Sequence, residues 1–219
     1  MIQKLIDKTN TSEFYYNCDL KLESYNFKTS DRIFEIILSI NQISYDEPIE
    51  YEEWKITCIN TERQAGFFWD IMLPYVKLKI LEEHPLLWEY QDNQLECEIN
   101  GVPENVNEFI GEISNVLEKE TGNWISVKEY FWNNEEYYAK YSKRTISIPK
   151  SLEKPIKTIC DKHNLSFKID NEIIGDDKGY SYKPNSKLLI FGNEDVSPND
   201  FNLHQPFIIA ENFIAERIK

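Results

Sequence analysis

The chain contains few of the residues from which phosphate-binding and metal-binding loops are usually built. Only 7 of its 219 residues are glycine and only 3 are histidine. Neither G-x-x-x-x-G-K-[ST] nor G-x-G-x-x-G occurs, which excludes the common nucleotide-binding loops. His84, His163 and His204 are far apart in sequence, none lies in H-E-x-x-H, and Gly175–Gly179 lacks the ligand pattern of a calcium loop. The sequence therefore predicts no cofactor and no metal ion.

The 4 cysteines are too far apart in sequence to form a local zinc site. Zinc knuckles need close pairs of thiolates, and no C-x-x-C pair occurs among Cys18, Cys58, Cys97 and Cys160. Two of them lie in strand-like patterns, so we expect buried, reduced thiols. No serine lies in G-x-S-x-G, and no cysteine has a local signature of a nucleophile.

Long apolar segments are absent as well. No run of roughly 18 apolar residues occurs, and the first residues, MIQKLIDKTNTSEFYY, contain no segment typical of a signal peptide. These absences predict a cytoplasmic protein without a membrane partner.

What the chain has in abundance is negative charge, and this charge is unevenly distributed. Residues 31–138 contain 7 Lys/Arg and 23 Asp/Glu, whereas the flanking segments are close to neutral and the whole chain has a net charge of −14. A negative surface repels nucleic acids and attracts basic proteins, so we expect no nucleic-acid partner. A modest group of basic residues near 140–157 could contact nucleic acid, but it suits ion pairs with the acidic segment of the same chain equally well.

The patterns of apolar residues predict an α+β fold with a largely antiparallel sheet packed by a few helices. Alternation and β-branched or aromatic content predict strands at Phe14–Leu22, Arg32–Ile43, Ile49–Ile59, Tyr75–Leu81, Gln94–Ile99, Leu165–Ile169 and Lys187–Phe191. Helical spacing predicts helices at Pro103–Thr121, Ser151–His163 and Phe207–Ile218. The segment Trp124–Trp132 suits a short strand or the start of a helix, and Asp170–Ser186 is rich in turn residues.

The change from acidic to slightly basic composition predicts a domain boundary near residue 142. The first predicted domain, 1–142, is an acidic α+β domain. The second, 143–219, is a smaller α+β domain or subdomain.

Three groups of acidic residues are interleaved with aromatic ones or lie on one face of the helix predicted at Pro103–Thr121. If Ile49–Ile59 is a strand, its two faces both carry acids, which is natural for an edge strand and awkward for a central one. Two interpretations stay open, a solvated face that keeps the protein soluble and a docking face. For docking, the candidate partner-binding residues are Glu50, Glu52, Glu53, Trp54, Glu82, Glu83 and Trp88.

The leading hypothesis is a non-enzymatic module that binds a basic protein. Its concrete version is a bacterial immunity or antitoxin-type inhibitor of a basic toxin, because acids supply electrostatic steering and aromatics supply anchors. The alternative is a hydrolase or metal-dependent enzyme whose carboxylates converge in a cleft. A pocket where acids meet His84 or another polar group would indicate such an enzyme. A second alternative is a structural or regulatory module that assembles with itself.

Overall fold

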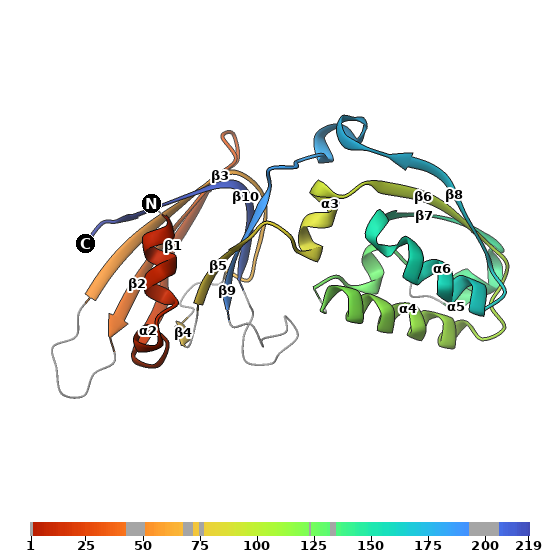
Figure 1. Ribbon diagram of the computed structural model, residues 1–219, viewed down its shortest axis with the longest axis horizontal. Coiled ribbons are helices and arrows are strands. Elements are labelled where there is room, and N and C mark those ends of the chain that lie inside the picture. Colours follow the sequence, from red (N-terminus) through yellow and green to blue (C-terminus); the bar gives the residue numbers. More distant parts are fainter. Residues whose placement is uncertain are drawn as a thin grey trace. The chain divides into compact units, whose positions relative to one another are not determined.

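The computed structural model describes residues 2–42, 51–67, 72–74, 77–122, 124–131, 135–192 and 206–219, and the chain forms two compact units (Figure 1). Unit 1 comprises residues Met1–Glu83 and Asn185–Lys219, and unit 2 comprises His84–Pro184. Unit 2 is therefore inserted into the sequence of unit 1. The predicted boundary at residue 142 lies inside unit 2, directly before a strand (Lys143–Pro149) that pairs with the earlier strand Gln94–Asn100.

Unit 1 is built on an antiparallel sheet with the strand order β4-β1-β2-β3-β10-β9-β5. Its strands are β1 (Cys18–Lys28), β2 (Ile33–Gln42), β3 (Tyr51–Ala65), β4 (Met72–Pro74), β5 (Lys77–Leu81), β9 (Lys187–Gly192) and β10 (Phe207–Arg217). The sequence predicted β2, β5 and β9 to within two residues at each end, whereas β3 continues beyond the predicted end at Ile59 to Ala65. The prediction of an α+β fold with a largely antiparallel sheet is confirmed.

Strand β3 lies between β2 and β10, so its two-sided acidity does not make it an edge strand. The predicted division into faces is confirmed, because Glu52, Trp54 and Ile56 are buried while the alternate positions are more exposed. A central strand tolerates Glu52 on its buried face because the structure supplies this carboxylate with internal partners, described below.

The prediction of a helix at Phe207–Ile218 is wrong, because this segment is strand β10 in the interior of the sheet. Its buried positions change phase along the strand. Ile208 and Ala210 face the core first, and Phe213 and Ala215 face it afterwards. The resulting three-residue spacing imitates a helix. Pairing with both β3 and β9 decides in favour of the strand.

Two short helices that the sequence did not predict precede the sheet, α1 (Ile2–Thr9) and α2 (Ser12–Asn17). Thr11 caps α2, since its Oγ1 accepts a hydrogen bond from the Phe14 N–H at 3.1 Å. The predicted strand Phe14–Leu22 therefore begins only at Cys18. Leu5 and Phe14 pack into the core of unit 1 with side chains of β1, β2, β3, β5, β9 and β10.

Unit 2 has two layers, a three-stranded sheet of order β7-β6-β8 with helices on one face (Figure 1). Its elements are η1 (Pro85–Leu87), α3 (Trp88–Gln91), β6 (Gln94–Asn100), α4 (Val106–Thr121), η2 (Val127–Glu129), α5 (Glu135–Lys140), β7 (Lys143–Pro149), η3 (Lys150–Leu152), α6 (Glu153–Lys162), β8 (Ser166–Ile173) and η4 (Gly175–Ser181). Leu95, Cys97 and Ile99 of β6 face the helices, and the alternate residues of β6 face the polar side.

Helix α4 confirms the helix predicted at Pro103–Thr121, although it begins only at Val106. The Asn105 side chain caps its first turn by accepting from the Glu108 N–H at 3.1 Å, and Phe109, Ile113 and Leu117 are buried. Gly122 ends the helix in the left-handed conformation, with φ of 60°, which glycine adopts without a steric penalty. No helix in the described part of the chain is long and apolar enough to cross a membrane.

Candidate functional site

The residues that the sequence predicted for partner binding lie in different environments. Glu50 lies outside the described residues. Glu82 and Glu83 are exposed, and Glu82 forms an ion pair with Lys187 of β9 at 2.5 Å. Trp88 opens α3 half-buried and packs against the core of unit 2. The described candidates therefore divide between the two units, with Trp88 in unit 2 and the others in unit 1.

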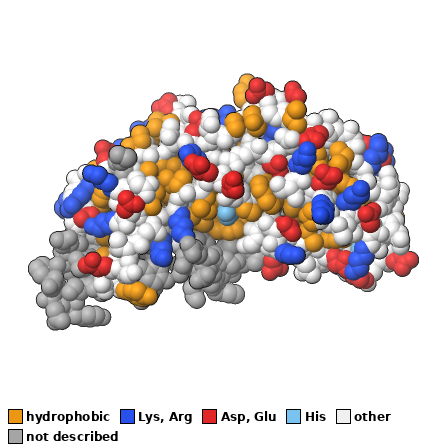
Figure 2. All heavy atoms as spheres, viewed as in Figure 1, with side chains coloured by type: hydrophobic (Ala, Val, Ile, Leu, Met, Phe, Trp, Pro, Cys, Tyr) orange, Lys and Arg blue, Asp and Glu red, His pale blue; other side chains and the backbone are white. Residues whose placement is uncertain are grey.

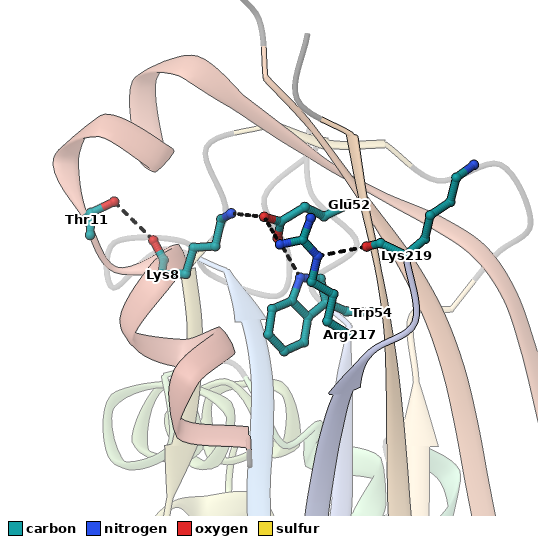
Figure 3. A network of polar contacts seen from close by, with 6 residues as sticks. All are labelled: Lys8, Thr11, Glu52, Trp54, Arg217 and Lys219. Carbon is teal, nitrogen blue, oxygen red and sulfur yellow. Dashed lines mark hydrogen bonds and ion pairs between the residues drawn. The ribbon is translucent and has the colours of Figure 1, made fainter.

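Glu52 and Trp54 belong to an internal network in unit 1 (Figure 3). The Glu52 carboxylate lies 2.8 Å from Lys8 Nζ and 3.1 Å from Arg217, and it accepts a hydrogen bond from Trp54 Nε1 at 2.9 Å. Arg217 Nε in turn donates to the Lys219 carbonyl oxygen at 2.8 Å. The network joins α1, β3 and the last residues of the chain.

The electrostatics of Glu52 suit this structural role. Burial by itself would raise the pKa of Glu52, but the hydrogen bonds from Lys8 and Trp54 and the charges of Lys8 and Arg217 outweigh it and lower the pKa. Glu52 is only 6% exposed and Trp54 only 8%. In this conformation neither side chain presents much surface to a partner.

On the opposite face of β3, Tyr51 and Glu53 form a local pair. The Tyr51 hydroxyl donates to the Glu53 carboxylate, which raises the pKa of Tyr51 to about 12. Lys219 Nζ lies 4.7 Å from the centre of the Tyr51 ring. Glu53 is half-buried and remains a predicted docking residue.

Many acids of the segment 31–138 pair with cations from the rest of the chain. Besides Glu52 with Lys8 and Arg217, the pairs are Glu35 with Lys28, Glu82 with Lys187, Glu98 with Lys143 and Glu112 with Lys162. In Figure 2 acidic and basic side chains are correspondingly interspersed over the face in view. The charge asymmetry of the sequence is thus partly cancelled on folding, although the net charge of −14 persists.

Unit 2 contains a cleft of about 280 Å³, which we call the η4 cleft. Its lining comes from three places, namely the ends of the three sheet strands, helix α3 and the 3₁₀ segment η4. The lining residues are Glu89, Gln94, Ser147, Ile173, Asp177, Lys178 and Ser181. Gln94 pairs with Ile173 in the sheet, so β6 and β8 are adjacent along the cleft.

Lys178 attaches η4 to the end of α3. Its Nζ donates to the carbonyl oxygens of Glu89 and Asp92 at 2.7 and 2.6 Å, two groups at the C-terminal end of α3 that carry partial negative charge. Burial lowers the pKa of Lys178. Two residues further on, Tyr180 is 98% exposed. The attachment therefore holds a fully exposed aromatic ring on a fixed turn.

Exposed acids line the η4 cleft and lie close to Tyr180 in the sequence. Asp176 and Asp177 directly precede Lys178, and Glu89 lies across the cleft on α3. Ile174, 51% exposed, adds an apolar contact surface before the turn. Carboxylates next to exposed aromatic and aliphatic side chains can receive the ammonium or guanidinium group of a partner together with its apolar stem.

His84 does not line the η4 cleft. Its Nδ1 accepts from the Leu86 N–H at 3.2 Å, its ring packs edge-on against Trp124 at 5.1 Å, and burial lowers its pKa to about 4. It caps η1. No group of three His, Cys, Asp or Glu side chains among the described residues is placed to hold a metal ion.

Sequence reasoning missed the η4 cleft because it recognised only turn residues in Asp170–Ser186. The first four of these residues continue β8, and the next part forms η4. A signal was present in the sequence, since two aspartates lie between Gly175 and Gly179 in a short turn-forming stretch and Tyr180 follows directly. The contact of Lys178 with α3 orients the turn. In the sequence, Lys178 lies 89 positions after Glu89 and 86 positions after Asp92.

Comparison with known proteins identified no relative of this chain. We found no match for the chain among protein-family models, among curated proteins or among solved structures.

Proposed function

We propose that this chain is a non-enzymatic module that binds a basic protein through the rim of the η4 cleft. The observation that carries the proposal is the 98% exposure of Tyr180 on a turn anchored by Lys178 and flanked by acids. The Lys178 contacts fix the backbone beside Tyr180, and a tyrosine side chain has only two torsions to order on binding, which favours tyrosine as an interface anchor. The narrower version is the immunity or antitoxin-type inhibitor of a basic toxin.

Charge supports the same proposal at longer range. A net charge of −14 accelerates the approach of a basic partner, and the acids at the cleft provide local contacts after the encounter. Carboxylates without a buried counterion are well suited to this, because binding does not first require breaking an internal ion pair. By this criterion Glu52 is a poor docking residue, and the exposed Asp176 and Asp177 are better ones. Glu89 is also exposed, but its charge already interacts with that of Lys178.

Selection of displayed random peptides against the purified chain tests the proposal. We expect wild type to enrich peptides rich in Lys and Arg, and we expect the variant E89K/D176K/D177K to lose them. Affinity of a synthesised selected peptide should fall at least about ten-fold in this variant. It should also weaken between low ionic strength and about 0.15 M, where the Debye length is about 8 Å.

The matched control is E104K/E120K/E129K, which reverses three exposed acids of unit 2 away from the η4 cleft. Both variants change the net charge equally, so a purely non-specific attraction would weaken equally in both. That result, or the absence of basic peptides from the wild-type selection, contradicts the proposal. A selective loss in the η4 variant supports it.

A further inference from the structure

The floor of the η4 cleft is the polar face of the sheet of unit 2, which points away from α4 and α6 (Figure 1). Gln94 and Ser147 alternate along β6 and β7 with residues that pack against the helices, so their side chains lie on the opposite face. Ile173 pairs with Gln94 and lies beside it on this face. The cleft therefore has a floor of sheet side chains, and α3 and η4 form its walls.

The polar side chains that line the cleft are available to a ligand. Within the described part of the chain, those of Gln94, Ser147 and Ser181 form no hydrogen bond. The Asp177 carboxylate likewise has neither a hydrogen bond nor an ion pair with another described residue. Lys178 Nζ, in contrast, already donates to two carbonyl oxygens at the end of α3. A ligand can therefore bind to Asp177 and to the floor without breaking an internal contact of these side chains.

The charge of the cleft favours a cation. Glu89 and Lys178 attract each other and largely cancel, which leaves the charge of Asp177 uncompensated. Glu96 of β6 adds an exposed negative charge on the same face of the sheet. Among the described residues, its carboxylate has only a neutral partner, the Asn171 side chain at 3.2 Å. A cationic ligand therefore meets a net negative charge both in the cleft and beside it.

The arrangement of the acceptors favours a guanidinium over an ammonium group. A guanidinium has five N–H donors in one plane that point in several directions, so it can reach Asp177 on the wall and Gln94 on the floor together. An ammonium has three donors around one point and is more strongly hydrated, so it loses more on leaving water. The cleft volume of about 280 Å³ lies just below the range of about 300–1,000 Å³ of small-molecule sites, which suits a single side chain.

We propose that the η4 cleft is a binding site for the guanidinium group of an arginine side chain. The guanidinium forms an ion pair with Asp177 and donates to the Gln94 side-chain oxygen and the Ser147 hydroxyl. Its methylene stem lies against Ile173. The inference rests on the proposed function for the molecule that carries this arginine, which is the basic protein partner. It adds that an arginine of the partner, and not a lysine, enters the cleft.

Titration of the isotope-labelled full-length chain with N-acetyl-arginine N-methylamide, followed by nuclear magnetic resonance, tests the site. The amide signals of β6, β7 and η4 around the cleft should shift, with a Kd on the order of 1 mM. N-acetyl-lysine N-methylamide should bind at least about five-fold more weakly, because it forms fewer hydrogen bonds. The neutral citrulline analogue, which keeps the shape of arginine without its charge, should leave these signals unchanged. Equal affinity for the arginine and lysine probes overturns the proposal.

Two variants that differ by one position provide a matched control. D177N removes the carboxylate that lines the cleft, whereas D176N removes the same charge from an exposed residue outside the lining. D177N should weaken binding of the arginine probe at least about five-fold, and D176N by less than about two-fold. Equal weakening in the two variants overturns the proposal, because it would reflect only the general charge of the surface. The amide signals of α4 serve as the control for folding in both.

The outcome is distinguishable from that of the peptide selection. If basic peptides are selected and depend on the acids of the η4 cleft, but the arginine probe does not bind there, the proposed function stands and the arginine site is overturned. If the probe binds and D177N alone weakens it, although no basic peptide is selected, the guanidinium site is supported and the proposed function falls.

Discussion

Replacing Glu52 by alanine removes the carboxylate that joins α1, β3 and the last residues of the chain. The largest loss comes from Trp54, whose Nε1–H donates to Glu52 at 2.9 Å in a buried environment. Leaving this donor without a partner costs about 1–3 kcal/mol. The side chains of Lys8 and Arg217 are 35% and 54% exposed, so they regain water and each lost ion pair adds no more than about 1 kcal/mol.

The expected destabilisation of E52A is therefore about 2–4 kcal/mol. With a urea dependence of about 2 kcal/mol per M, the unfolding midpoint of unit 1 falls by about 1–2 M. Urea titration with tryptophan fluorescence and circular dichroism measures the shift. The control E53A changes the next residue, on the opposite face of β3, and should leave the midpoint nearly unchanged. A midpoint for E52A equal to that of E53A would refute the structural role of the network.

The pH dependence provides a second test of the same residue. The pKa of Glu52 is lower in the folded chain than its ordinary value, so its contribution to stability is complete above the unfolded pKa of about 4.3. The contribution is lost as the pH falls from there through the lowered pKa. E52Q removes this acid-sensitive contribution, and its stability should change less steeply with pH below about 4.3 than that of wild type.

His84, the cysteines and Lys178 offer further tests. Burial lowers the pKa of His84 to about 4, so the unfolded chain binds a proton more readily than the folded one. The free energy of unfolding of wild type should therefore fall by on the order of 2 kcal/mol between pH 6.5 and 4, whereas that of H84N should not. Urea midpoints across this pH range measure the difference. Alkylation by iodoacetamide at pH 8, followed by mass spectrometry, should reach half-buried Cys18 first and the buried thiols Cys58, Cys97 and Cys160 only on unfolding. K178M should increase hydrogen exchange of the η4 amides while that of α4 stays unchanged, and equal exchange in η4 would show that the lysine does not anchor the turn.

The parts of the fold that could be predicted from the sequence are those determined by local periodicity. Helix α4 is the clearest case, because its apolar stripe, its first-turn acid and the glycine stop all indicate the same structure. Strand β10 shows where periodicity fails, since its change of phase imitates a helix and only the neighbouring strands show otherwise. The insertion of unit 2 also has no local signal, because it depends on pairing between β5 and β9, which are far apart in the chain.

The candidate site was harder to predict for the same reason. The acids around Tyr51 and Trp54 were conspicuous in the sequence, but Glu52 has cationic partners at positions 8 and 217, which no local pattern reveals. The exposure of Tyr180 depends on a turn whose anchor is the far end of α3. Charge could thus be counted from the sequence, whereas the accessible share of that charge depends on long-range contacts.

The insertion of unit 2 has a consequence for how the protein emerges from the ribosome. Unit 2 is one continuous segment, His84–Pro184, and can complete its core while the rest of the chain is still being made. Unit 1 must wait for β9 and β10, and the Lys8–Glu52–Arg217 network forms only after Arg217 has left the ribosome. Until then the apolar strands of the first half have no β10 beside them. A chaperone that binds exposed strands therefore has a long interval in which to act on this half of the protein.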